Sequence, residues 1–127
     1  MKQLPGSLSV ALVFVLHHAV ALSAVDDFSW LEGVFCWSDP ATSTAGRVTY
    51  KVIGPDKLAV TKEVKNPHAR SIGTVQARFT LTSTGFTLDE GREILTFVKQ
   101  DLNHIVLSKY SYGRIEVESD IAHVRCN

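Results

Sequence analysis

The feature that most constrains this chain is a series of short segments in which apolar and polar residues alternate. About eight such segments recur roughly every 8–12 residues, separated by turn residues such as Gly54 and Pro55. Because successive side chains of a strand point to opposite sides, the pattern predicts strands that each bury one face. No helical period of useful length occurs. The sequence therefore predicts an all-β fold, an antiparallel barrel of about eight strands, with a β-sandwich as the alternative.

The alternation also predicts which side chains face inward. In the strand predicted at residues 58–64, Lys62 interrupts an otherwise apolar face. Near the end of the chain the apolar positions change parity between residues 115–117 and 122–124, which predicts a bulge at residues 119–120. The clearest alternating segment places four apolar side chains inside: Val75, Ala77, Phe79 and Leu81.

The chain has two cysteines, Cys36 and Cys126, one in the first predicted strand and one next to the C-terminus. In a secreted chain this count predicts one disulfide. Such a bond would join the first strand to the last, as closure of a barrel requires. The alternative, two free thiols in metal or redox chemistry, lacks the C-x-x-C spacing typical of such sites.

The first residues have the pattern of a signal peptide. A single lysine precedes an apolar run, and Ala21, Ser23 and Ala24 each fit the end of a cleaved leader. The apolar stretch is interrupted by two histidines and falls short of the ~20 residues that a spanning helix needs. We therefore expect a signal peptide at residues 1–24, one domain at residues 25–127, and a protein secreted to the extracellular space or the periplasm.

The charges balance, with 13 Lys and Arg against 13 Asp and Glu. A nucleic-acid-binding protein needs a basic surface, so nucleic acid is not an expected partner. The same balance argues against electrostatic attachment to a membrane once the leader is removed. We expect a monomer that requires no cofactor.

The start of the predicted domain resembles the lipocalin and calycin families. A short helical turn leads through Gly33 into the first strand, with Phe35 where lipocalins usually have Trp, and a cysteine follows late in the chain. The four residues Trp30-Leu31-Glu32-Gly33 also resemble the start of small secreted bacterial domains that begin W-L-x-G-x-W. The resemblance implies a barrel that holds one small apolar ligand. The motif that carries it reads Trp30-Leu31-Glu32-Gly33-Val34-Phe35.

A ligand inside such a barrel would meet aromatic side chains. An eight-stranded barrel is either filled by its own side chains or just wide enough for one small ligand, and the sequence is compatible with both. The residues expected to contact a ligand are Trp37, Tyr50, Phe79 and Phe97.

Neither metal binding nor catalysis is expected. His68, His104 and His123 lack the spacing of a metal site and are predicted to be separate surface residues. The last strand supplies the Glu, His and Arg residues that small secreted ribonucleases use, but outward-facing strand positions explain them better. These residues are Glu116, Glu118, His123 and Arg125.

Two polar segments, residues 38–46 and 65–71, are predicted as loops and could contact a protein partner. The favoured function is binding of a small hydrophobic molecule inside the barrel, without enzymatic activity. A secreted protein-binding or inhibitory domain is the alternative, and a small secreted hydrolase or ribonuclease is a remote one.

Overall fold

The computed structural model describes residues 28–127. The predicted signal peptide and the start of the mature chain therefore lie outside the described residues. Within the described part, a single turn of 3-10 helix, η1 (Ser29–Leu31), precedes the strands, as predicted. No helix in residues 28–127 has the length and apolar character needed to cross a membrane.

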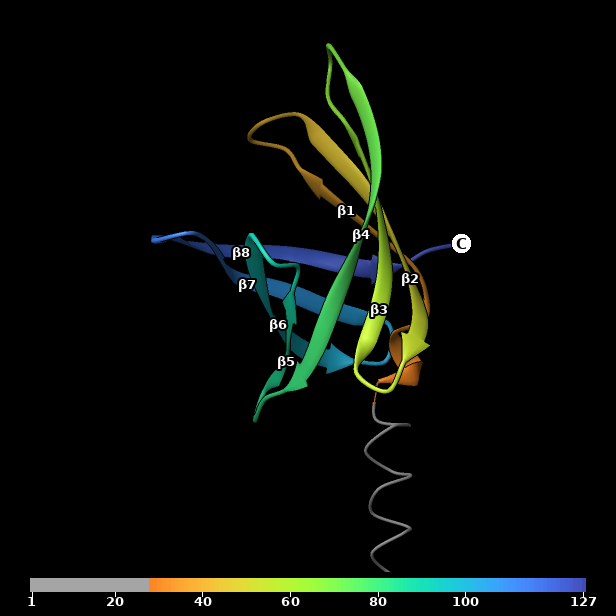
Figure 1. Cartoon of the computed structure of the whole chain (residues 1–127). Coiled ribbons are helices and arrows are strands. Elements are labelled where there is room, and N and C mark those ends of the chain that lie inside the picture. The colour runs from red at the N-terminus through yellow and green to blue at the C-terminus, as the bar shows by residue number, and fades with distance from the viewer. Residues whose placement is uncertain (1–27) are drawn as a thin grey trace, which may run out of the picture. The chain divides into compact units, whose positions relative to one another are not determined.

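Eight antiparallel strands form a closed barrel in which each strand pairs with its neighbours in the sequence and the last pairs with the first (Figure 1). This confirms the predicted barrel and excludes the sandwich. All eight strands belong to the compact unit Leu31–Asn127. The strands are β1 (Gly33–Asp39), β2 (Thr44–Gly54), β3 (Lys57–Lys65), β4 (Arg70–Leu81), β5 (Gly85–Asp89), β6 (Glu93–Asp101), β7 (His104–Tyr112) and β8 (Ile115–Arg125).

The seam between β1 and β8 is short and is reinforced covalently. Only two residue pairs join the strands, Phe35 with Arg125 and Cys36 with Val124. Cys36 forms the predicted disulfide with Cys126, with 5.8 Å between their Cα atoms. The Arg125 guanidinium lies 4.6 Å from the Phe35 ring centroid. The disulfide thus lies where the hydrogen-bonded ladder is weakest.

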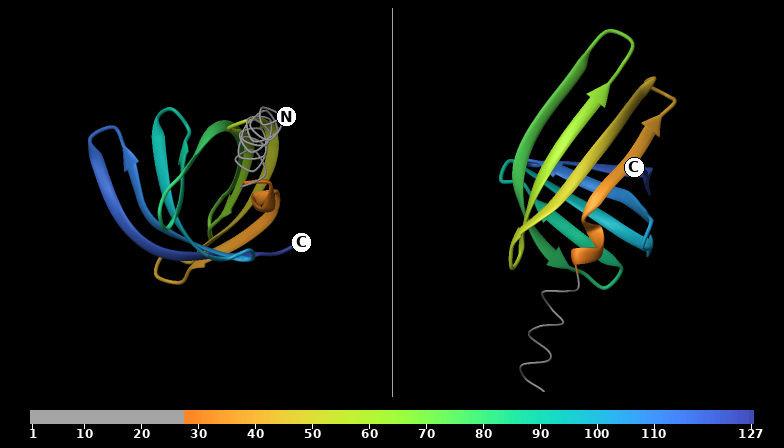
Figure 2. Two further views of the ribbon diagram at one scale, coloured as in Figure 1. Left: turned by 90° about the horizontal axis from the view of Figure 1, so that it is seen from below. Right: turned by 90° about the vertical axis from the view of Figure 1, so that its right-hand side faces the viewer.

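One end of the barrel is packed and the other is splayed. At the packed end, the rings of Phe79, Phe86 and Phe97 stack in series, with centroids 5.1 and 5.0 Å apart. At the other end, β4 pairs with β5 only from Arg78 to Leu81, so the first part of β4 has no neighbour on that side. Figure 2 shows the β1–β2 and β3–β4 hairpins diverging there from strands β5 to β8.

Two of the four side chains predicted for the core of β4 are exposed, one for each of two reasons. Ala77 and Phe79 are buried as expected, but Val75 is 40% exposed and Leu81 is 56% exposed. Val75 lies in the part of β4 that β5 does not reach, so no opposite wall covers its side chain. Leu81 is the last residue of its strand. A side chain at an inward-facing strand position is buried only where the sheet curves back over it.

The bulge predicted near the C-terminus is present. Leu107 of β7 pairs with Ile121, whereas Lys109 pairs with Glu118, so β8 has one extra residue at this point. The backbone N–H of Ile121 donates to Ser119 Oγ at 3.4 Å. The inward-facing residues of β8 nevertheless keep odd numbers on both sides of this bulge, because β7 carries an extra residue relative to β6 at the same level.

Candidate ligand-binding site

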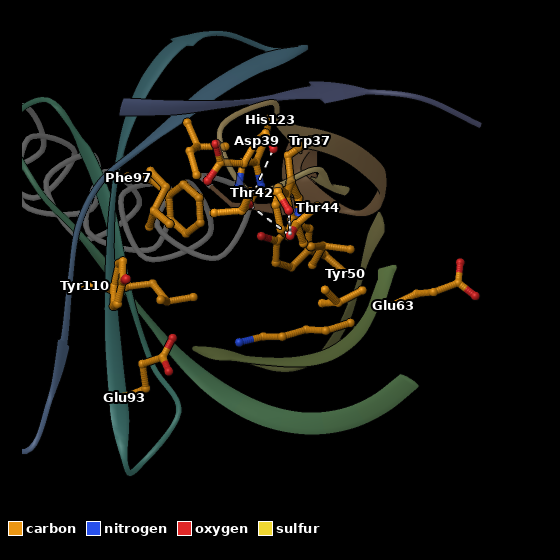
Figure 3. Close-up of a pocket in the computed structure, with 16 residues that line it drawn as sticks. Trp37, Asp39, Thr42, Thr44, Tyr50, Glu63, Glu93, Phe97, Tyr110 and His123 are labelled. Atoms are coloured by element: carbon orange, nitrogen blue, oxygen red, sulfur yellow. Dashed lines mark hydrogen bonds between the residues drawn. The ribbon is translucent and has the colours of Figure 1, made fainter. Parts of the chain in front are cut away.

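The splayed end holds a cavity of about 330 Å³ (Figure 3). Its lining is mostly apolar, with side chains from β1, β2, β3, β6, β7 and β8. The buried lining residues are apolar apart from His123. The barrel interior is therefore filled by phenylalanines at one end and hollow at the other.

Three of the four residues expected to contact a ligand line this cavity: Trp37, Tyr50 and Phe97. Phe79 does not line it, because its ring is stacked against Phe86 in the packed end. Tyr50 is 2% exposed, and its ring meets that of Phe35 edge-on at 5.8 Å. Burial, with a smaller contribution from the charge of Glu90, raises the pKa of the Tyr50 hydroxyl.

Trp37 owes its position to a glycine. Gly46 is its partner on β2, and a Cβ atom at Gly46 would lie 2.2 Å from the indole Nε1. The missing side chain leaves room for the indole ring to lie flat over the β2 backbone. Trp37 thereby forms one wall of the cavity.

His123 is the site residue that the sequence analysis missed. It was predicted to be a surface residue, but it is 5% exposed and lines the cavity. Its ring stacks on Trp37 with centroids 6.0 Å apart and meets Phe97 edge-on at 5.4 Å. His123 faces inward like Ile121, two residues before it, while Ala122 and Val124, the apolar residues beside it, are exposed. Continued alternation from Ile115 and Val117 predicts this inward position, whereas the apolar character of Ala122 and Val124 indicates the opposite face.

The His123 imidazole is neutral at physiological pH. Burial, together with the positive charge of Lys62, lowers the pKa of this imidazole from 6.5 to about 4. Its Nδ1 atom is buried and has no hydrogen-bond partner in the described part of the chain. A neutral imidazole offers one donor and one acceptor, so the ring retains unused hydrogen-bonding capacity.

Lys62, which interrupts the apolar face of β3, pairs with Glu90. Lys62 Nζ donates to Glu90 Oε1 at 2.6 Å, and the side chains are 31% and 6% exposed. Burial raises the pKa of the Glu90 carboxyl, although the hydrogen bond and charge of Lys62 act in the opposite direction. Glu90 Oε2 is buried without a hydrogen-bond partner among the described residues. Lys62 therefore brings a charge to the cavity lining that a carboxylate already neutralises.

Replacing Lys62 with Met should lower the free energy of unfolding by about 2 kcal/mol at pH 7, because Glu90 keeps a buried charge without its partner. This figure is below the usual range for broken buried pairs, since Lys62 is partly exposed. The loss should become smaller as the pH is lowered, because burial raises the pKa of the Glu90 carboxyl and its protonation removes the unpaired charge. Urea denaturation of Lys62→Met and of Lys62→Met/Glu90→Gln checks this. The double variant should recover most of the loss, and equal losses in both would contradict the explanation.

The residues considered for catalysis are not brought together. Glu116 forms an ion pair with Lys109 at 3.1 Å, and Glu118 is exposed. Neither lines the cavity that contains His123. Arg125 Nη1 donates to the carbonyl oxygen of Glu32 at 2.9 Å. Both glutamates lie on the outer face of β8, whereas His123 lies on its inner face.

The other two histidines lie at the surface, as predicted. His104 Nδ1 is 2.8 Å from Asp101 Oδ1, and the hydrogen bond from His104 lowers the pKa of that carboxyl. His68 is exposed in the β3–β4 turn. No group of three or more His, Cys, Asp or Glu side chains that could hold a metal ion occurs within residues 28–127.

The predicted loops are shorter in the structure. Ser38 and Asp39 belong to β1, and β2 begins at Thr44, so residues 40–43 make the first turn. The second turn is confined to residues 66–69 instead of 65–71. Polar residues predicted these loops, but polar side chains also occupy strand ends that face solvent.

The site is thus an apolar cavity with a stacked aromatic wall, a buried neutral imidazole and an internally paired lysine. The phenylalanine stack fills the packed end of the barrel, and its last member, Phe97, also lines the cavity. Comparisons of the chain with protein-family models, curated proteins and solved structures found no match.

Proposed function

We propose that this protein binds a small, mostly apolar molecule in the barrel cavity, in the manner of a lipocalin. The observation that carries the proposal is the cavity of about 330 Å³, whose lining is mostly apolar and includes a few polar groups. Ligand pockets are typically ~300–1,000 Å³ and have this kind of lining. Trp37, Tyr50, Phe97 and His123 are the residues proposed to contact the ligand.

The proposed place of action is an oxidising compartment outside the cytoplasm. The Cys36–Cys126 disulfide supports this, because such bonds persist in secreted and periplasmic proteins and are rare in the cytosol. In this proposal the protein acts as a monomer and catalyses no reaction. Ligand binding accounts for the cavity without a chemical step.

Binding of a protein partner is the second candidate function. The turns at residues 40–43 and 66–69 lie at the splayed end of the barrel, and Thr42 of the first turn lines the cavity. A partner held by these turns would cover the cavity mouth. The two functions therefore predict different outcomes when the cavity itself is filled.

Native mass spectrometry of the mature protein, purified from its own secretion medium, tests the proposal. We expect a non-covalent mass excess of a few hundred daltons, roughly the size of a ligand for a pocket of this class. Ile121→Trp should remove this excess, because Ile121 lines the cavity. Ala122→Trp is the matched control, because Ala122 is exposed on the opposite face of β8.

Loss of the mass excess in Ile121→Trp alone supports binding inside the barrel. Equal retention in both variants would place the ligand elsewhere and overturn the proposal. A bare wild-type mass, together with unchanged capture of a protein partner by Ile121→Trp, would favour the second candidate function.

A further inference from the structure

Two carboxylates face the cavity without a positively charged partner. Asp39 ends β1 and Glu93 begins β6, and both line the cavity. Figure 3 shows them on different sides of it. Asp39 Oδ1 accepts a hydrogen bond from the backbone N–H of Ala41 at 3.1 Å. No ion pair to either carboxylate occurs among the residues that the structure describes.

The nearby cations already have partners. Lys62 is paired with Glu90, as described above. Arg70 donates from Nε to Glu63 Oε2 at 3.0 Å, which neutralises the third carboxylate of the cavity lining. The Arg92 guanidinium lies over the Tyr112 ring at 5.8 Å. When the pairs are set aside, the lining retains two negative charges, from Asp39 and Glu93.

A second, independent feature points to a ligand with a flat ring and a hydrogen-bonding group. His123 lines the cavity and is only 5% exposed. Its Nδ1 atom has no hydrogen-bond partner in residues 28–127. Its ring and that of Trp37 are within 18° of parallel, while Phe97 meets His123 edge-on. Flat walls of this kind fit a flat ring system, and an indole face also attracts a cation.

From these features we infer that the ligand is an organic cation, with a flat apolar ring system against Trp37 and a protonated amine directed at Asp39 and Glu93. This inference rests on the proposed function and specifies its ligand class. An anionic ligand would face two uncompensated carboxylates, and the one lysine of the cavity lining is already paired. A neutral ligand would form no ion pair with Asp39 or Glu93.

Three probes of nearly equal size and different charge test the inference: 2-naphthylmethylamine, 2-naphthylmethanol and 2-naphthoate. Isothermal titration calorimetry with the disulfide-bonded mature protein at pH 7 gives the dissociation constants. The amine should bind about tenfold more tightly than the alcohol, and the carboxylate more weakly than either. Raising the salt concentration should reduce the preference for the amine, because the carboxylates lie near the rim.

Asp39→Asn/Glu93→Gln should bring the amine and the alcohol to within about twofold of each other, since the charge that distinguishes them is removed. Glu116→Gln is the control, because Glu116 is exposed and does not line the cavity. Equal or tighter binding of 2-naphthoate would overturn the inference and leave the proposed function intact. Absence of binding by all three probes would also overturn it. The proposed function would fail as well only if the native mass spectrum showed no ligand.

Discussion

Replacing both cysteines with alanine should lower the free energy of unfolding by roughly 4–5 kcal/mol. The disulfide closes a loop with a sequence separation of 90 residues, and a loop of this length strongly restricts the denatured chain. A domain of ~100 residues has only ~5–15 kcal/mol of total stability, so the loss would consume much of it. In the folded barrel the same bond reinforces the β1–β8 seam, whose register has two residue pairs.

Urea denaturation of the oxidised wild type and of Cys36→Ala/Cys126→Ala measures this difference. The wild type after reduction and alkylation gives a second estimate without the mutations. Alkylation of the unreduced, denatured wild type should add no mass, since both thiols are in the bond. A loss below about 1 kcal/mol would show that the denatured chain is compact enough for the cross-link to restrict little.

The strands could be predicted because their period is local. Alternation at every second residue identified the barrel, and the parity change near Ser119 identified the bulge in β8. The disulfide followed from cysteine count and compartment. What alternation could not show was where the sheet curves back on itself. Val75, Ile115 and Val117 occupy apolar strand positions yet are 40%, 66% and 36% exposed.

The candidate site was predicted less completely, because its main features join distant parts of the chain. Lys62 could be recognised as an interruption of an apolar face, but its partner Glu90 lies in another hairpin. His123 has the same parity as Ile115 and Val117, so unbroken alternation along β8 predicts its inward position. The rule that apolar residues mark the interior predicts the opposite face, because Ala122 and Val124 are apolar, yet both are exposed. The geometry that hollows the barrel arises from strand pairings that end early, which no local pattern records.

Replacing His123 with Phe should remove an acid-sensitive component of stability. In the folded protein the pKa of His123 is about 4, whereas an unfolded histidine has its ordinary value of 6.5. Between these values the unfolded chain binds a proton that the folded protein excludes. Stability therefore falls as the pH decreases from 6.5 to 4. The difference between the two pKa values corresponds to roughly 3 kcal/mol.

The quantity to measure is the difference in unfolding free energy between wild type and His123→Phe, from urea denaturation at several pH values between 4 and 8. Relative to the variant, the wild type should lose roughly 3 kcal/mol from pH 7 to pH 4 and should show no further change above pH 7. Phe keeps an aromatic ring against Trp37 and Phe97, so the stacking is retained while the titrating group is removed.

Glu90 titrates in the opposite direction and must be separated from His123. Its pKa is raised in the folded state, so its contribution to stability is present at low pH and is lost as the pH rises. Both proteins contain Glu90, and its contribution therefore largely cancels in the difference between them. His68→Phe is the matched control, because His68 is exposed in a turn and does not line the cavity. A flat difference for His123→Phe would mean that solvent reaches the imidazole in the folded protein, and His123 would then not be a buried, neutral group of the cavity lining.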